Sequence, residues 1–135
     1  NHARNIKYAK IKTPNGIRTV INFHGLWNGK GKTDSEDRLE QSQKIAEFIK
    51  KIANPVVLCG DFNLLPDTES LRKIEDIGLR NLIKEFKITS TRTRLYKKPE
   101  KFADYVLVSK DVKVNEFKVL PEEVSDHAAI YLDFE

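Results

Sequence analysis

The chain of 135 residues has a single cysteine, Cys59, no methionine, six glycines and five prolines. One cysteine excludes an internal disulfide framework, and its apolar neighbours Val56, Val57 and Leu58 predict a small core residue rather than a reactive thiol. No run approaches the ~20 apolar residues that a membrane span needs, and residues 1–12 lack the apolar core of a signal peptide. We therefore expect no membrane span and a cytoplasmic, reducing location.

The composition is that of a globular domain. Hydrophobic residues make up 39% and charged residues 33%, which excludes a disordered or fibrous chain. The length predicts a single domain, or part of one, over residues 1–135. The net charge of +4 favours a polyanionic partner such as nucleic acid or an anionic lipid head group, although many mildly basic domains bind neither.

The N-terminal region has the pattern of a β-hairpin. Residues 5–12 and 17–24 flank Pro14-Asn15-Gly16, where Asn-Gly would supply the positive φ angles of a tight turn. In the second strand the alternating residues Ile17, Thr19, Ile21 and Phe23 share one face. His24 therefore leaves from the opposite face, at the end of the strand.

The following segments predict an α/β layer. Apolar residues at three- and four-residue steps predict a helix over residues 35–53, capped by Asp34 or Ser35, and a buried strand follows over residues 55–60. A short helix over residues 68–77 should end at Gly78. The remaining predicted elements are a short helix containing Leu79, Leu82, Ile83 and Phe86, and strands over residues 102–108, 112–119 and 128–134, with a β-bulge between Val114 and Phe117.

Polar residues gather at the ends of these predicted strands, where α/β folds assemble their sites. Asp61 and Asn63 follow the buried strand and provide the oxygen ligands and amide donor that hold Mg²⁺ and a phosphate. Gly-Asp-x-Asn after a strand is also typical of a turn closed by Asx hydrogen bonds. The motif by itself leaves both interpretations open.

Two further features have the same double interpretation. Asp104 is a carboxylate in an otherwise apolar strand and needs a partner such as an imidazole, unless it is an edge or cap charge. Asp126-His127 could pair a metal-binding carboxylate with a general base, since an unperturbed imidazole has a pKa of about 6.5, or could lie in a surface turn. His24 could donate to a phosphate oxygen or be structural.

In this order the motifs resemble the endonuclease/exonuclease/phosphatase superfamily, which has the deoxyribonuclease-I-like fold. The resemblance covers residues 17–134. Val-Val-Leu-Cys-Gly-Asp-Phe-Asn resembles the family's Gly-Asp-x-Asn strand, Phe-Ala-Asp-Tyr-Val-Leu-Val-Ser its Asp-Tyr strand, Val-Ser-Asp-His its closing motif and Asn-Phe-His-Gly-Leu-Trp the strand end with a histidine. The implied fold class is the C-terminal half of a layered α/β sandwich, with a mixed, mostly antiparallel sheet flanked by helices.

The resemblance also implies the role of each residue. His127 would be the general base, held by Asp104, and Asp61 and Asn63 would position the nucleophile and the phosphate. Asp126, together with Asp61, would bind Mg²⁺ or Mn²⁺, and His24 would stabilise charge on the phosphate. Besides His24 and Asn63, the substrate would contact Arg92 and Arg94 in the basic stretch before the Asp104 strand, unless that stretch is a solvated loop.

The chain departs from the family in one respect. Family members carry a glutamate metal ligand before the histidine strand, but no glutamate precedes Glu36 here. We therefore expect the C-terminal portion of such a domain, with weak Mg²⁺ binding and no activity as an isolated chain. The apolar sheet face left open should drive self-association or pair with a missing N-terminal half.

The resulting functional prediction is a metal-dependent phosphodiesterase or nuclease acting on nucleic acid. A phospholipid or small-molecule phosphatase of the same family is the first alternative, because the scaffold does not determine the substrate. A non-catalytic binding module with the same fold is the second alternative. The missing glutamate favours a binding module, whereas the retained set of six polar residues favours an enzyme.

Overall fold

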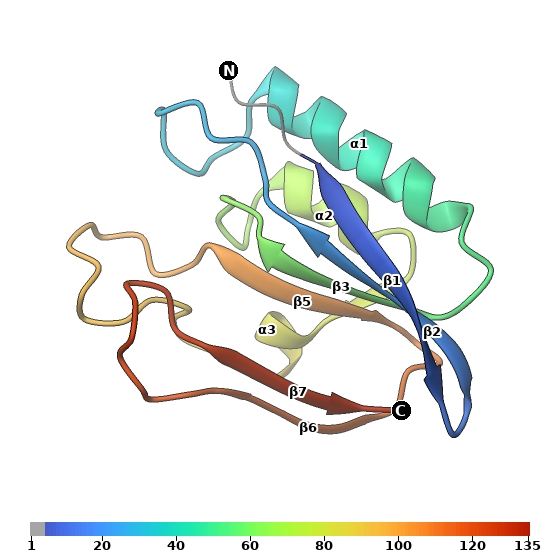
Figure 1. Ribbon diagram of the computed structural model, residues 1–135. Helices are drawn as coiled ribbons and strands as arrows, with labels where there is room; N and C mark the ends of the chain where they lie inside the picture. Colours follow the sequence, from blue (N-terminus) through green and yellow to red (C-terminus); the bar gives the residue numbers. More distant parts are fainter. Residues whose placement is uncertain (1–4) are drawn as a thin grey trace.

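The computed structural model describes residues 5–135, so the first four residues of the predicted domain lie outside it. A five-stranded sheet of order β1-β2-β3-β5-β4 forms its centre (Figure 1). Its strands are β1 (Ile6–Thr13), β2 (Gly16–Phe23), β3 (Val56–Asp61), β4 (Leu79–Asn81) and β5 (Asp104–Ser109). Only the β2–β3 pair is parallel, so the predicted α/β class with a mixed, mostly antiparallel sheet is confirmed.

The predicted hairpin is formed by β1 and β2, but its turn differs from the prediction. Thr13 pairs with Gly16, which leaves Pro14 and Asn15 as the two turn residues. Gly16 has a φ of 111°, and Asn15 is not among the residues with positive φ. The Thr13 hydroxyl donates to the Gly16 carbonyl at 2.7 Å and accepts from the Asn15 amide, which stabilises this shorter turn.

Two helices cover one face of the sheet, α1 (Glu36–Lys50) and α2 (Glu69–Glu75). Their apolar sides pack on Ile21, Leu58 and Leu107, which are fully buried. Ser35 caps α1, as predicted, because its hydroxyl accepts from the Arg38 amide. No helix within residues 5–135 has the length and apolar character to cross a membrane.

The other predicted cap, Asp34, stabilises a different helix. Its carboxylate accepts from the backbone amides of Glu69 and Ser70 at 2.9 and 2.8 Å, and from the Ser70 hydroxyl at 2.6 Å. These groups lie at the N-terminus of α2, where amides lack helical partners. Asp34 therefore joins the loop before α1 to the start of α2.

The segment after α2 differs from the short helix that was expected to contain Leu79, Leu82, Ile83 and Phe86. Leu79–Asn81 forms β4, the edge strand paired with β5, and only Leu82–Glu85 is helical, as α3. Asn81 ends the strand and caps the helix, since its side chain accepts from the Ile83 and Lys84 amides. Pairing with the distant strand β5 sets this boundary, and the local hydrophobic periodicity does not indicate that pairing.

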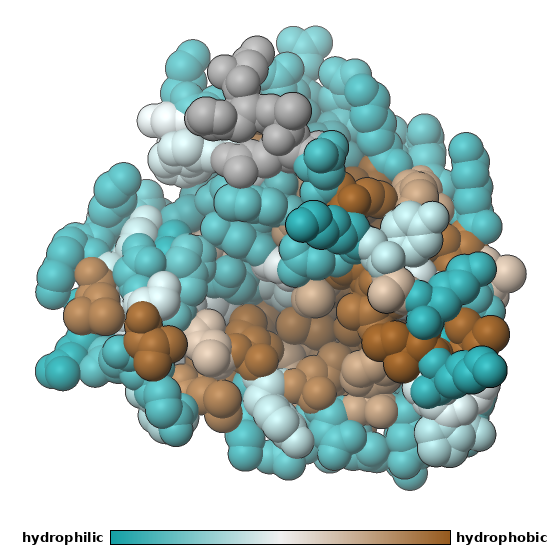
Figure 2. Space-filling model, viewed as in Figure 1, coloured by the Kyte–Doolittle hydropathy of each residue, from teal (hydrophilic) through white to brown (hydrophobic). Residues whose placement is uncertain are grey.

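The remaining strands, β6 (Val114–Val119) and β7 (Ile130–Phe134), form a separate two-stranded sheet. The predicted bulge is confirmed, because the register shifts between Val114 and Glu116. β7 lies over the sheet face opposite the helices (Figure 1). We call this second face the open face, and Figure 2 shows hydrophobic residues gathered on it and surrounded by hydrophilic ones.

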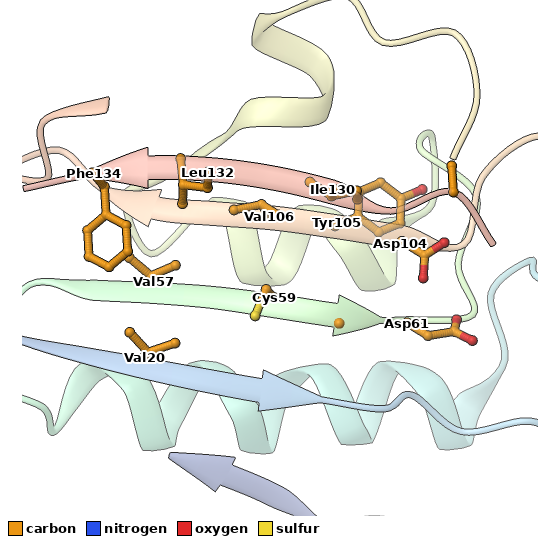
Figure 3. A pocket seen from close by; sticks show the side chains of 12 residues that line it. Val20, Val57, Cys59, Asp61, Asp104, Tyr105, Val106, Ile130, Leu132 and Phe134 are labelled. Atoms are coloured by element: carbon orange, nitrogen blue, oxygen red, sulfur yellow. The ribbon is translucent and has the colours of Figure 1, made fainter. Parts of the chain in front are cut away.

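An apolar trough of about 410 Å³ runs between the open face and β7 (Figure 3). Figure 3 shows Asp61 and Asp104 together at one end of it. Burial raises the pKa of the Cys59 thiol, which lies in the trough as a free cysteine. The apolar side chains of the trough include Val20, Val57, Val106, Ile130, Leu132 and Phe134.

Candidate active site

Two glycines let β2 and β3 approach closely where they end. A Cβ on Gly60 would lie 1.9 Å from the Phe23 carbonyl oxygen, and one on Gly25 would lie 2.1 Å from that of Phe62. Gly60 also has a φ of 140°, which favours glycine. The Gly25 amide donates to the Asp61 carbonyl at 2.7 Å, so His24 is held next to Asp61.

Asp104, the first residue of β5, pairs with His127 of the segment before β7. The Nδ1 of His127 lies 2.9 and 3.1 Å from the two carboxylate oxygens of Asp104. Burial raises the pKa of the Asp104 carboxyl, which the hydrogen bond and charge of His127 partly offset. The carboxylate therefore has the imidazole partner that its position in an apolar strand requires.

Both site histidines converge on one carboxylate oxygen. The Nε2 atoms of His24 and His127 each lie 3.7 Å from Oδ2 of Asp61. This distance exceeds that of a hydrogen bond. Asp61 and Asp104 are directly opposite each other on β3 and β5, which brings the ligand atoms of Asp61, Asp104 and His127 within 4.8 Å of one another.

Asn63 follows Asp61 in a left-handed conformation, with a φ of 53°. Its amide donates to Oδ1 of Asp61 at 3.0 Å, which is the Asx-type bond of the turn interpretation. Its buried side-chain amide donates to the Gly25 carbonyl at 3.1 Å. The motif therefore joins the ends of β2 and β3. Asn63 still lines, together with Asp61, a polar pocket that also contains His24 and His127.

Asp126 and the two predicted substrate arginines lie in different surroundings. Oδ2 of Asp126 is 3.6 Å from Nη1 of Arg92, and both residues line the polar pocket. The guanidinium of Arg94 pairs with Glu123 at 2.7 Å, and its side chain is 84% exposed. Arg94 is not among the residues that line the pocket.

Thr91 is a residue of this site that the sequence did not indicate. It is fully buried, and its hydroxyl accepts from the backbone amides of Ala103 and Asp104 at 3.1 and 3.3 Å. Its carbonyl accepts from the Ala128 amide at 2.9 Å, and Arg92 forms a β-bridge with His127. Thr91 thus ties the backbone of Asp104 to that of the His127 segment, a link that depends on contacts distant in sequence.

The polar pocket also holds residues that were not among the predicted site residues. Its volume is about 320 Å³, and it contains His24, Asp61, Asn63 and His127. Two lysines and two aromatic residues complete its lining, namely Lys32, Lys98, Trp27 and Tyr96. Trp27 ends the Asn-Phe-His-Gly-Leu-Trp segment and Lys98 lies in the basic stretch before the Asp104 strand, whereas no sequence pattern indicated Lys32 or Tyr96.

The donor set fits a divalent cation in part. Carboxylate oxygens are the ligands that Mg²⁺ prefers, and Oδ2 of Asp61 faces the pocket beside both histidines. Asp104 directs both carboxylate oxygens to His127, and Asp126 pairs with Arg92. Within residues 5–135, the cluster whose ligand atoms could share one ion is Asp61, Asp104 and His127, and a complete coordination shell needs further ligands.

The chain resembles known proteins in both sequence and structure. The model of the Endonuclease/Exonuclease/phosphatase family matches residues 3–127. No match was found among curated proteins.

Several solved structures share the fold at low sequence identity. The endonuclease/exonuclease/phosphatase of Bacteroides vulgatus is 23% identical with a TM-score of 0.73, over 98% of this chain and 55% of its own. The mannosyl-6-phosphatase of Bacteroides thetaiotaomicron is 20% identical with a TM-score of 0.73, over 98% and 57%. The D. rerio TDP2 complexed with single strand DNA product is 18% identical with a TM-score of 0.70, over 98% and 62%. The chain thus spans little more than half the length of these structures.

Proposed function

Because this chain belongs to the endonuclease/exonuclease/phosphatase family, we propose that it carries the histidine and aspartate portion of a metal-dependent phosphodiesterase site acting on nucleic acid. The observation that carries the proposal is the contact of both Asp104 carboxylate oxygens with His127 Nδ1, beside Asp61. A carboxylate that holds one ring nitrogen of a histidine leaves the other available for proton transfer.

In the proposed reaction His127 acts as the general base. With Nδ1–H donated to Asp104, Nε2 is the unprotonated nitrogen and faces the pocket near Asp61. There it accepts a proton from the attacking water, and the Asp104 carboxylate stabilises the imidazolium that forms. Asp61 orients the same water, and His24 and Asn63 contact the scissile phosphate.

Asp61 and Asp126 would hold the divalent cation. Held by these carboxylates, Mg²⁺ or Mn²⁺ would supply positive charge to the phosphate oxygens. Asp126 also lies 3.6 Å from the Arg92 guanidinium, so Arg92 competes with the metal cation for this carboxylate. With only two such carboxylates, we expect weak cation binding by the chain alone.

The pocket lining favours nucleic acid as the substrate. Lys32, Arg92 and Lys98 contribute positive charge for the phosphate backbone. The rings of Trp27 and Tyr96 offer surfaces on which bases stack. Aromatic and cationic residues side by side are more useful to a nuclease than to a phosphatase of small esters, which is why we rank nucleic acid first.

The direct test is Mg²⁺-dependent hydrolysis of plasmid DNA, RNA and bis(p-nitrophenyl) phosphate. We expect hydrolysis by the complete polypeptide that the gene encodes, its loss in His127→Ala, and no change in Lys44→Ala on the exposed side of α1. The 135-residue chain alone should be inactive because it has no glutamate before Glu36. A complete polypeptide that binds DNA and hydrolyses none of the three substrates would instead be a binding module.

We also propose that the open face mediates self-association. Its trough is lined mainly by apolar side chains, and contiguous apolar surface of this kind favours an interface. A second copy presenting the same face would cover both troughs. Light scattering should then detect dimers at micromolar concentration, and a monodisperse monomer would contradict the proposal.

A further inference from the structure

A cationic cluster forms part of the polar pocket and is not used in the proposed proton transfer. Arg92 stacks on the ring of Tyr96, with its guanidinium carbon 3.7 Å from the ring centroid. The Lys32 ammonium lies 5.0 Å from the same centroid and donates to the Tyr96 hydroxyl at 3.0 Å. Residues from two separate loops therefore place two cations around one ring.

Both cations are buried, which costs free energy unless negative charge compensates them. Lys32 is 4% exposed, and the Arg92 side chain is 8% exposed, with its Nε lacking any hydrogen-bond partner. Among residues 5–135, Lys32 has no carboxylate within 4.0 Å. Asp126 is 3.6 Å from Arg92, and Glu100 accepts from the Tyr96 hydroxyl and interacts with the Lys32 charge at longer range.

Within residues 5–135, no carboxylate lies within hydrogen-bond distance of the Lys32 or Arg92 side-chain nitrogens, and the cluster shares its pocket with His127 and Asp61. A ligand anion would supply negative charge and accept hydrogen bonds from both cations. Trp27 lies in the same pocket with the Lys98 ammonium 5.9 Å from its ring, which suits a nucleoside between two phosphates.

We propose that Lys32 and Arg92 bind a second phosphate of the substrate, adjacent to the scissile phosphate at His127 and Asp61. This inference rests on the proposed function and narrows its substrate to a nucleotide or nucleic-acid end with two neighbouring phosphates. Arg94, which is exposed and paired with Glu123, lies outside this subsite.

The experiment compares ligands with one and two phosphates by isothermal titration calorimetry, in the absence of divalent metal. Thymidine 3′,5′-bisphosphate should bind at least roughly tenfold more tightly than thymidine 5′-monophosphate, because hydrogen bonds to charged groups contribute this much. A 5′-phosphorylated thymidine dinucleotide replaces the second monoester with a diester and so distinguishes a terminal phosphate from an internal one.

Lys32→Met keeps the apolar stem, removes the charge and should abolish the preference for two phosphates, whereas Arg94→Met should keep it. Arg92→Gln is an independent variant should Lys32→Met fail to fold in circular dichroism. Equal binding of all ligands by the unaltered protein, or an unchanged preference in folded Lys32→Met and Arg92→Gln, would overturn the subsite alone. Failure of every ligand to bind would overturn the proposed phosphate site as well.

Discussion

The two faces of the central sheet use the same strands for different purposes. On β3, Leu58 points to the helices and is fully buried, whereas Cys59 and Asp61 lie on the open face. On β5, Leu107 belongs to the helix-covered core, whereas Asp104 begins the open face. Strand alternation thus separates residues that stabilise the fold from residues that we propose to carry its chemistry.

The covered face is closed by aromatic and aliphatic contacts. Phe62 packs between Phe23 and Tyr105, with ring centroids 5.2 and 5.3 Å apart, and the Tyr105 hydroxyl donates to the Leu64 carbonyl. The open face has its polar groups at one end and an apolar trough along the rest. A change on the covered face should therefore affect mainly stability and a change at the polar end of the open face mainly function, and five substitutions test this separation.

The largest expected effect is on the open face. Asp104→Asn removes the negative charge that holds His127 Nδ1–H and stabilises the imidazolium. We expect the rate of hydrolysis by the complete polypeptide to fall roughly 100- to 10,000-fold, the usual contribution of general base catalysis. Steady-state kinetics on bis(p-nitrophenyl) phosphate would measure it, with circular dichroism as the control for folding. Activity within a few fold of the unaltered protein would remove Asp104 from the mechanism.

A matched pair of leucine substitutions compares the faces directly. Leu58→Ala on the covered face should lower the free energy of unfolding by about 2–5 kcal/mol, because the closed core leaves a cavity. Leu132→Ala, on the partly exposed trough, should cost less than half as much and should weaken self-association. Urea unfolding and light scattering measure the two quantities. If Leu58→Ala and Leu132→Ala lowered the free energy of unfolding equally, the open face would be as tightly packed as the covered face, which would contradict the comparison.

Thr91→Val tests the link between the fold and the site. The change leaves the Ala103 and Asp104 amides without their acceptor and should cost about 1–3 kcal/mol of stability. Activity should fall together with stability, and Thr91→Ser, which keeps the hydroxyl, should restore both. Thr89→Val, on the exposed surface nearby, is the control in thermal unfolding and kinetics. A stable, fully active Thr91→Val protein would contradict the positioning role.

The smallest effect concerns the helix layer and depends on pH. Burial acts to raise the pKa of Asp34, but hydrogen bonds from Ser70 and the Glu69 amide outweigh it, so the pKa lies below its ordinary value of 3.8. A lowered pKa means that the stabilisation is present above pH 3.8 and is lost as the pH falls through the lower value. Asp34→Ala should cost about 1 kcal/mol at pH 7.

The difference between Asp34→Ala and the unaltered protein should shrink in urea unfolding below pH 3.8. Asp111→Ala, in an exposed loop, supplies the matched control for loss of one carboxylate. A difference that stays constant between pH 7 and pH 3 would exclude the ionised carboxylate as its cause.

Most elements of the fold were predictable because their signals are local. The α1 periodicity, the Ser35 cap and the bulge near Val114 all depend on residues close in sequence. The helix expected from Leu79 failed at its start, because pairing with β5 made Leu79–Asn81 a strand. Asp34 was one of two candidate caps for the nearer helix, since nothing local indicates that α2 begins beside it in space.

Most of the residues proposed from the sequence for the site lie together in the structure, and one does not. His24, Asp61, Asn63 and His127 line one pocket, and Asp104 pairs with His127. Arg92 lines that pocket with Asp126, whereas Arg94 pairs with Glu123 outside it. Two arginines one residue apart in a basic stretch look equivalent in the sequence, and only the loop conformation distinguishes their surroundings.

The sequence by itself determined the strand alternation, the family and the types of residue at the strand ends. Short-range sterics and hydrophobic periodicity act within a few residues, so the linear order of the chain records them. The tertiary structure alone decided that Thr91 joins Asp104 to His127 and that Lys32 and Arg92 meet around Tyr96. Those contacts join segments far apart in the chain, and they exist only because the packing of both sheets brings the loops together.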